Sequence, residues 1–265
     1  MGRRILFHFV AAAVLCAAWA ATAGAQDFRQ SFNLAQGGSI TIKNVSGDIN
    51  ISGYDGATVE VSAYKEGRDR DQVAVENLST PNHVSLRAEY PHNCECDASL
   101  RFEVKVPRSV RFNFERISTA SGNLNAENVT GRVEMNTASG DVLLSGVSGE
   151  IRASSASGTV KVKDSAGSVN ASSASGNVEV ELSRVEGDGD MHFSSASGNV
   201  EVRLPATIDA TVEMSTVSGD LETNFPIEVE KAKYGPGKRA RGQLGGGSRI
   251  LKISSASGDV SLKSL

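Results

Sequence analysis

The chain has 265 residues, of which 39% are hydrophobic and only 5% aromatic, and its formal net charge at pH 7 is -4. This length suffices for one or two domains with a sizeable core, which must be built mainly from small aliphatic side chains. The acidic balance argues against a nucleic-acid partner, because binding to phosphates requires clustered basic residues.

Residues 1–25 have the pattern of a secretory signal peptide. Arg3 and Arg4 form a positively charged start, which an apolar run over residues 5–21 follows. Small residues then lead to the expected cleavage site after Ala25. Beyond that site no stretch approaches the roughly 18 apolar residues of a membrane span. We therefore expect an exported protein, whether periplasmic, cell-surface or secreted, with no integral membrane segment after signal removal.

Residues 26–116 contain strand-like segments but no regular repeat. Segments such as SITIK at 39–43 and FEVKV at 102–106 alternate apolar and polar residues, as a half-buried strand does. Most aromatic residues of the mature chain also fall in this region. We expect an irregular β cap that covers the open edge of the first repeat unit.

Two cysteines of the cap region, Cys94 and Cys96, are separated by one residue. Cysteines of exported proteins are usually oxidised. In an extended strand their Cα atoms would be about 6.6 Å apart, near the upper limit for a disulfide. We interpret the pair as a locally bent Cys-x-Cys disulfide. A metal site formed by His92 and both thiolates is the alternative.

From residue 117 onward a glycine repeat organises the chain. Glycines recur every nine residues from 122 to 176, and Ala-Ser-Gly recurs at twice that interval in the same stretch. The second, fourth and seventh residues after each glycine are apolar, except at Ser165 and Ser183. This alternation predicts strands with one buried face, and Ser-Gly followed by Asp, Asn or Thr predicts turns.

These features predict an all-β fold, with a parallel β-solenoid (β-helix) of about 18 residues per coil over residues 117–265. The outward positions support this stacking, because an offset of one coil places three pairs of oppositely charged residues side by side. The pairs are Lys161 with Glu179, Lys163 with Glu181, and Glu134 with Arg152. Val160 and Val162 should face the core. An antiparallel β meander is the alternative, since the hydrophobic pattern alone also permits it.

Several segments, taken in order, resemble a known family. They read GSITI at 38–42, VSGDI at 45–49, VKVP at 104–107 and SGDV at 257–260, with the Ser-Gly-Asp/Asn series before the last of them. In this order they are similar to the bacterial putative-adhesin family of unknown function, whose members are described by β-strand repeats. The resemblance implies an all-β, solenoid-like extracytoplasmic domain, and it supplies no catalytic residues.

Motifs for catalysis and metal binding find little support. The chain has neither a zinc-protease helix motif nor a Gly-x-Ser-x-Gly elbow. Residues 117–192 also lack Phe, Tyr and Trp, so they offer no aromatic ring on which a sugar would stack. We predict no cofactor and no catalytic residue. The segment EGDGD at 186–190 has three carboxylates, and we interpret it as a solvated acidic turn rather than a metal site.

Two surface features are candidates for ligand contact. The motif SSASG recurs at 154–158 and 172–176, so an offset of one coil stacks Ser154 on Ser172 and Ser155 on Ser173. We interpret this strip of hydroxyls as a contact for a repetitive ligand such as a glycan, although a tight corner also requires small residues. The second feature is a basic loop formed by Lys231, Lys233, Lys238, Arg239 and Arg241. It could contact a polyanion or a lipid headgroup, although a flexible excursion that bridges two coils explains it more simply.

Taken together, the sequence predicts an exported, non-enzymatic, adhesin-like binding or structural module of the bacterial cell envelope. Its expected partner is an envelope or surface glycan or a protein. Two other functions stay open, namely a carbohydrate-active enzyme built on a β-helix and a periplasmic partner of a membrane signalling system.

Overall fold

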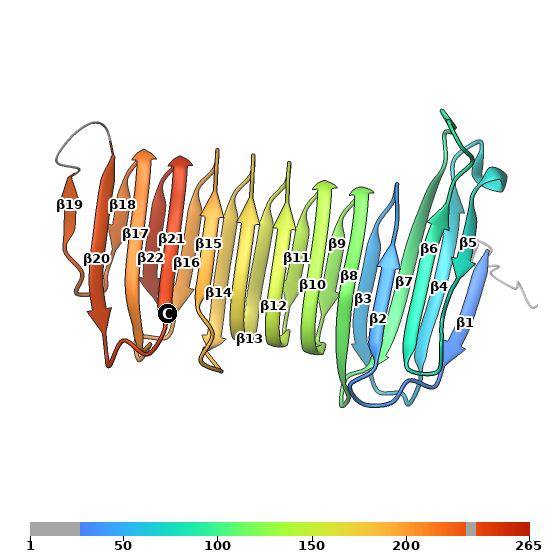
Figure 1. The fold of residues 1–265 in the computed structure, drawn as a ribbon, viewed down its shortest axis with the longest axis horizontal. Helices are drawn as coiled ribbons and strands as arrows, with labels where there is room; N and C mark the ends of the chain where they lie inside the picture. The colour runs from blue at the N-terminus through green and yellow to red at the C-terminus, as the bar shows by residue number, and fades with distance from the viewer. Residues whose placement is uncertain (1–26, 232–236) are drawn as a thin grey trace, which may run out of the picture.

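The computed structural model describes residues 27–231 and 237–265, and over these residues the fold is all-β, as predicted. This described part has 22 strands and one short 3-10 helix, Arg70–Gln72 (Figure 1). None of its helices has the length and apolar character needed to cross a membrane. The predicted signal peptide, residues 1–25, and its cleavage after Ala25 lie outside the described residues.

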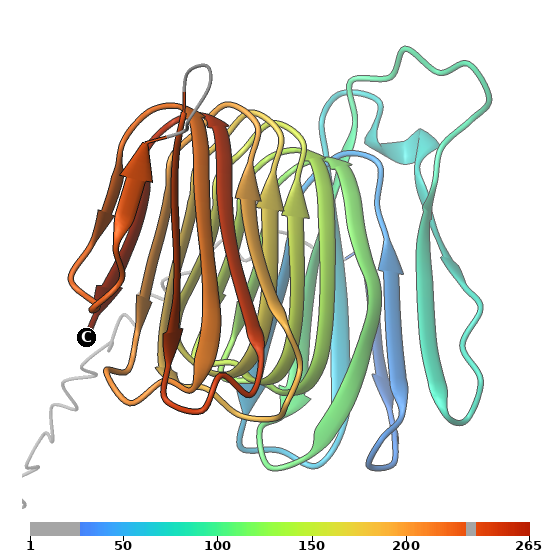
Figure 2. The same cartoon turned by 60° about the vertical axis from the view of Figure 1, so that its left-hand side comes forward.

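The strands form two layers that face each other and are connected by turns along the length of the molecule (Figure 2). The strands of layer A, in spatial order, are β1 (Phe28–Phe32), β4 (Val59–Glu66), β7 (Ser99–Pro107), β3 (Ile49–Tyr54), β9 (Leu124–Glu127), β11 (Val142–Ser145), β13 (Val160–Ser173), β14 (Val178–Arg184), β16 (Val200–Leu204), β22 (Val260–Ser264) and β18 (Leu221–Thr223). Those of layer B are β5 (Ala74–Asn77), β6 (His83–Glu89), β2 (Ser39–Lys43), β8 (Arg111–Ser121), β10 (Thr130–Ser139), β12 (Ser148–Ser155), the second half of β13, β15 (Met191–Ser195), β21 (Ile250–Ser257), β17 (Ala210–Ser218), β20 (Lys238–Leu244) and β19 (Val229–Lys231). β13 passes from layer A into layer B and so belongs to both.

Neighbouring strands of the glycine repeat pair in parallel. In layer B, Ile151 is opposite Val169, and in layer A, Val160 is opposite both Val142 and Val178. These pairings differ from the antiparallel meander considered as the alternative. Antiparallel pairs occur towards the ends of the stack, in β1–β4–β7, β5–β6 and β17–β20–β19. Strand orientation in the whole fold is therefore mixed.

Both ends of the stack depart from simple chain order. The strands β2 and β3 lie between β6–β7 on one side and β8–β9 on the other. The last strands, β21 and β22, lie in the same way between β15–β16 and β17–β18. Each of these segments thus has hydrogen-bonded neighbours on both sides. The outermost strands are short or antiparallel, which protects the open edges from pairing with other chains.

The core lies between the two layers. Val160 and Val162 are fully buried, whereas Lys161 and Lys163 face outward, as the alternation predicts. Ser165, which interrupts the apolar pattern, is also fully buried. Its hydroxyl donates to the carbonyl of Lys163 at 2.7 Å and accepts a backbone N–H of the preceding unit at 3.2 Å. A polar side chain fits this corner because both of its hydrogen-bonding roles are satisfied.

Two of the three predicted charge pairs are in register, Lys161 with Glu179 and Glu134 with Arg152. The third pair is not, because the register of β13 and β14 shifts after Val162, where Asp164 has a left-handed φ of 48°. Lys163 and Glu181 are therefore not register partners.

The boundary predicted between residues 116 and 117 falls within β8. Of the predicted cap region, β2 stacks directly on β8 and β3 on β9, so the parallel stack begins before residue 117. The division into a cap over 26–116 and a repeat domain over 117–265 stays a prediction.

Candidate ligand-binding groove

A groove of about 1010 Å³ crosses seven strands of layer B near the turns that lead to layer A. Three rows of residues line it, and each row has at most one residue on a strand. The hydroxyl row consists of Ser118, Asn136, Ser154, Ser172, Ser194, Ser254 and Ser215. The buried row consists of Thr119, Thr137, Ser155, Ser173, Ser195 and Ser255. The methyl row consists of Ala138, Ala156, Ala174, Ala196, Ala256 and Val217.

The buried row forms the floor of the groove and has a structural role. The hydroxyl of Ser155 donates to the carbonyl of Gly140, and that of Ser173 donates to the carbonyl of Gly158, both at 2.8 Å. Ser195 and Ser255 repeat this contact at 2.8 Å. Because these hydroxyls are buried and already donate to turn carbonyls, Ser155 and Ser173 do not belong to an outward strip. The predicted strip is therefore wrong for these two residues.

The hydroxyl row lies on the rim of the groove, and all its members are half-buried. Ser154 is opposite Ser172 as predicted, and the row continues from Ser172 to Ser194 and onward. Ser154 donates to the side-chain oxygen of Asn136 at 2.5 Å. Within the described residues, the other five hydroxyls of the row make no hydrogen bond, namely those of Ser118, Ser172, Ser194, Ser254 and Ser215.

Backbone groups at the groove are engaged in the fold. The N–H of Ala156 donates to the carbonyl of Thr137 at 3.1 Å, and the N–H of Ala174 donates to the carbonyl of Ser155 at the same distance. The N–H of Ser175 likewise donates to the carbonyl of Ala156 at 2.9 Å. The groove therefore offers a ligand side-chain hydroxyls on one wall and exposed methyl groups on the other.

The Ser-Gly-Asp/Asn repeat has a structural explanation that sequence reasoning missed. The side-chain oxygen of Asn123 accepts the N–H of Asp141 at 2.9 Å, and that of Asp141 accepts the N–H of Thr159 at 2.8 Å. The glycines stack as closely, since a Cβ on Gly140 would lie 2.0 Å from the carbonyl oxygen of Gly122. The recurrence of Gly-Asx at intervals of 18 residues, interrupted at Thr159, is the sequence signal for both ladders.

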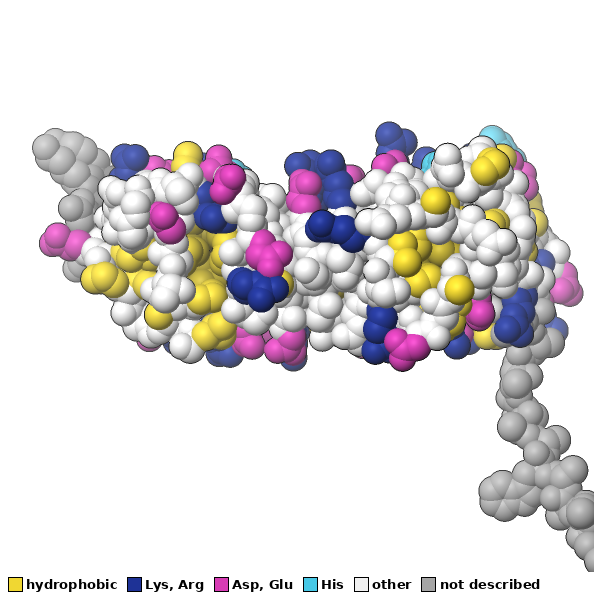
Figure 3. Space-filling model, turned by 90° about the horizontal axis from the view of Figure 1, so that it is seen from below, with side chains coloured by type: hydrophobic (Ala, Val, Ile, Leu, Met, Phe, Trp, Pro, Cys, Tyr) yellow, Lys and Arg dark blue, Asp and Glu magenta, His cyan; other side chains and the backbone are white. Residues whose placement is uncertain are grey.

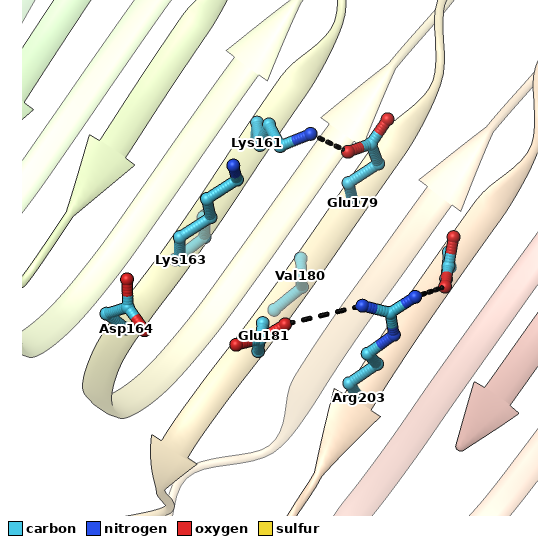
Figure 4. A pocket seen from close by; sticks show the side chains of 9 residues that line it. Lys161, Lys163, Asp164, Glu179, Val180, Glu181 and Arg203 are labelled. Carbon is cyan, nitrogen blue, oxygen red and sulfur yellow. Dashed lines mark hydrogen bonds and ion pairs between the residues drawn. The ribbon is translucent and has the colours of Figure 1, made fainter. Parts of the chain in front are cut away.

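The outer face of layer A is different in character (Figure 4). Its hollow of about 420 Å³ is lined almost entirely by charged side chains that pair across strands. Lys161 forms an ion pair with Glu179. Arg203 contacts Glu201 at 2.6 Å and Glu181 at 3.5 Å.

The side of the molecule seen from below (Figure 3) is mixed in character. Charged side chains of both signs lie close together on it, and hydrophobic surface gathers in two separate areas.

Cys94 and Cys96 lie side by side in the loop between β6 and β7. Their Cα atoms are 5.0 Å apart and their Sγ atoms are in contact. This spacing is within the range that a disulfide bridges, and the disulfide itself stays a prediction. Within the described residues no three His, Cys, Asp or Glu side chains are grouped as metal ligands.

The acidic turn at 186–190 uses two of its carboxylates within the protein. Glu186 lies 2.5 Å from the Nε of Arg184, and Asp190 accepts the N–H of Ile250 at 2.8 Å. These contacts anchor the inserted loop to its own strand and to β21.

Four of the five residues of the predicted basic loop lie in the described part of the chain, and its role as a polyanion site stays a prediction. Lys233 lies outside the described residues, and Lys231 is the last residue of β19. Lys238 forms an ion pair with Asp220, and Arg241 contacts Glu213 at 3.2 Å. Arg239 is exposed and has no ion pair in the described part of the chain.

Three residues with a raised pKa lie in the N-terminal part, away from the groove. A hydrogen bond to Asp97 raises the pKa of Arg68, and burial raises the pKa of Tyr90. Burial lowers the pKa of Arg101, but its two carboxylate partners, Glu66 and Glu103, outweigh this effect. These shifts arise from structural ion pairs and packing, so they do not indicate a catalytic centre.

The fold and the groove define an elongated, all-β repeat domain with a ligand-accessible face. The chain belongs to the Toastrack DUF4097 family, whose profile matches residues 35–263, and this confirms the resemblance found in the sequence. None of the curated proteins compared with the chain matches it.

Similar solved structures share low sequence identity with the chain. A "putative cell adhesion protein" from Clostridium sporogenes has a TM-score of 0.41 at 12% identity, covering 90% of this chain and 99% of its own. A "putative adhesin" from Bacteroides fragilis has a TM-score of 0.36 at 13% identity, with coverages of 90% and 96%. One from Parabacteroides distasonis has a TM-score of 0.34 at 14% identity, again with 90% and 96%.

Proposed function

We propose that this protein is an exported, non-enzymatic binding module of the bacterial cell envelope, and that its groove holds a linear, hydroxyl-rich polymer such as a glycan. The observation that carries the proposal is the hydroxyl row, in which five serine hydroxyls at the rim of a continuous groove have no partner in the described residues. We further propose that the fold is a parallel β-solenoid with two nine-residue units per coil, capped by residues 26–116.

The dimensions of the groove favour a repetitive ligand. Strands of a sheet lie about 4.8 Å apart, so the seven members of the hydroxyl row, from Ser118 to Ser215, extend over about 29 Å. Each serine hydroxyl can both donate and accept a hydrogen bond. A polymer with evenly spaced hydroxyls can meet several of them at once, so that weak contacts add up.

The two walls suit a sugar chain better than a peptide. Sugar rings present hydroxyls at their edges and C–H groups on their faces, which match the hydroxyl row and the methyl row. An extended peptide would bind by adding main-chain hydrogen bonds to a free strand edge. The N–H groups of Ala156 and Ala174 at the groove already donate to neighbouring strands, so that mode finds no free donor there.

Binding without cleavage is supported by the composition of the groove. Most glycoside hydrolases use a pair of Asp or Glu residues on either side of the scissile bond. Among the residues that line this groove there is neither Asp nor Glu. Export is supported by the signal-like residues 1–25 and by the 5.0 Å Cα spacing of Cys94 and Cys96, which fits a disulfide of an oxidising compartment.

The proposal is tested by filling the groove. The double variant Ser172→Leu, Ser194→Leu places two bulky uncharged side chains on the rim, and an array of envelope polysaccharides reports binding. A matched control, Ser52→Leu with Ser145→Leu, changes two half-buried serines on the outer face of layer A. Thermal unfolding shows that each variant is folded.

We expect the groove variant to lose at least tenfold in affinity for any polysaccharide that the unaltered protein binds, and the control to keep it. Unchanged binding by the groove variant would overturn the site. Release of oligosaccharide from a bound polymer would instead support the carbohydrate-active enzyme.

A further inference from the structure

The groove lacks negative charge although the chain as a whole is acidic. The formal net charge is -4, yet none of the residues that line the groove is Asp or Glu. Cations lie beside both ends of the hydroxyl row, as the pairing of the flanking strands shows. The lining of the groove is therefore uncharged, and cations lie beside its two ends.

At the N-terminal end, two cations are neighbours. Lys43 on β2 is opposite Ser118, the first member of the hydroxyl row, and on its other side it is opposite Arg87 of β6. Arg87 contacts Glu76 at 2.6 Å, whereas Lys43 is exposed and has no ion pair in the described residues. Like charges on directly opposite residues repel each other, and a bound anion would relieve this repulsion.

At the C-terminal end, β20 places Arg239 opposite Ser215, the last member of the hydroxyl row. Arg239 is exposed and, among the described residues, forms no ion pair. On its other side the register partner is Glu230 of β19.

A third cation lies beside Ser254, the sixth of the seven members of the row. Lys252 precedes Ser254 by two residues on β21, so both side chains are on the outer face, and Lys252 is exposed without an ion pair in the described part. Its register partner Glu213 contacts Arg241 at 3.2 Å. The same outer row contains Glu134, a carboxylate that likewise has no ion pair there. Lys43, Lys252 and Arg239 are thus cations beside the row that have no ion pair in the described residues.

We propose that the polymer held by the groove is acidic, a linear glycan with carboxylate or sulfate groups, whose charges are bound by Lys43, Lys252 and Arg239. This inference rests on the proposed function and names the ligand class of the same site. Eight strand intervals separate Lys43 from Arg239, which corresponds to about 38 Å. A chain must be at least this long to contact both end cations.

The test uses one polymer backbone in two charge states, polygalacturonate and its fully methyl-esterified form. Affinities for both are measured at low and high salt, because exposed charge contacts are screened by salt. The variant Lys43→Glu, Arg239→Glu reverses the end charges. The control Lys105→Glu, Lys163→Glu makes the same change in net charge at exposed positions of layer A.

We expect the acidic polymer to bind at least tenfold more tightly than the ester at low salt. The end-charge variant should lose this preference, and the control should keep it. Oligomers of polygalacturonate shorter than about 38 Å should bind markedly less tightly, since they cannot reach both ends.

Equal binding of the acid and the ester would overturn the acidic ligand while leaving the groove as a glycan site. A preference that survives in the end-charge variant but is lost in the control would place the polyanion on layer A instead. Failure of both polymers to bind would count against the proposed function as well.

Discussion

The two outer faces of the molecule rest on the same core but differ in how their polar groups are satisfied. On layer A, side chains such as Lys161 and Glu179 pair with each other across strands. On layer B, the hydroxyls of Ser172 and Ser194 have no partner in the described residues, although they occupy equivalent outward positions. The fold alone therefore does not decide which face could bind a ligand. The outward residue on each strand makes the difference, because a face whose charged groups already pair with each other has few free groups for a ligand.

The first prediction concerns the core that both faces share. Val160→Asp buries a carboxylate at a fully buried position, and an unpaired buried charge costs several kcal/mol. We expect the domain to unfold or to lose most of its stability in chemical denaturation. The adjacent Lys161→Asp should cost less than about 1 kcal/mol, as is usual for exposed pairs. Equal losses from the two substitutions would show that the assigned alternation is wrong.

The second prediction concerns the glycine ladder at the turns, where backbones of successive repeats approach closely. In Gly140→Ala, the new Cβ would lie 2.0 Å from the carbonyl oxygen of Gly122, at a φ of 150°. We expect a loss of about 3 kcal/mol or more, because backbone atoms must move. Gly187→Ala is the control, since its φ of 76° is strained but nothing lies within 4 Å. It should cost about 1 kcal/mol. A larger loss of stability in Gly187→Ala than in Gly140→Ala, measured by thermal unfolding, would contradict the ladder.

The third prediction separates the floor of the groove from its rim. Ser173→Ala leaves the carbonyl of Gly158 without its 2.8 Å donor, which should cost about 1 kcal/mol. Ser172→Ala removes a hydroxyl that has no partner in the described residues, so its effect should stay within about 0.5 kcal/mol. Urea unfolding of both variants measures the difference. A larger loss from Ser172→Ala would mean that the rim, not the floor, stabilises the fold.

The fourth prediction repairs a gap in the ladder of turn side chains. Thr159 accepts no backbone N–H from Asn177 in the described structure, whereas Asp141 and Asn123 each accept one from the next coil. Thr159→Asn supplies the missing carbonyl oxygen and should stabilise the protein by about 0.5 kcal/mol. Thr159→Val, which cannot accept, should give no gain. Thermal unfolding of both variants checks this: the midpoint should rise for Thr159→Asn and should not rise for Thr159→Val.

The repeat made the interior of the fold predictable from sequence. The nine-residue spacing of glycines and the alternation around Val160 and Val162 placed buried and exposed residues correctly. The doubled period of the Ala-Ser-Gly motif also brought Ser154 opposite Ser172, as expected. Periodicity is informative here because each strand repeats the environment of the one before it.

The ends and the division of labour within the groove were not predictable in the same way. A repeat pattern carries no signal that β21 returns between β15 and β17, because that order depends on contacts between segments far apart in the chain. The motif alone also did not reveal the different roles of Ser172 and Ser173. Both are serines, but the alternation of β13 continues through Ser173, so its hydroxyl turns inward and reaches a turn carbonyl.

The central claim, that the hydroxyl face of layer B binds the ligand, is tested most directly by NMR of alanine methyl groups during titration with polygalacturonate. We predict that the methyl resonances of alanines in the methyl row, such as Ala156, Ala174 and Ala196, shift on binding. Those of the core alanines Ala126 and Ala171 should stay in place, since both are buried between the layers. Binding that leaves the methyl row unshifted would contradict the claim.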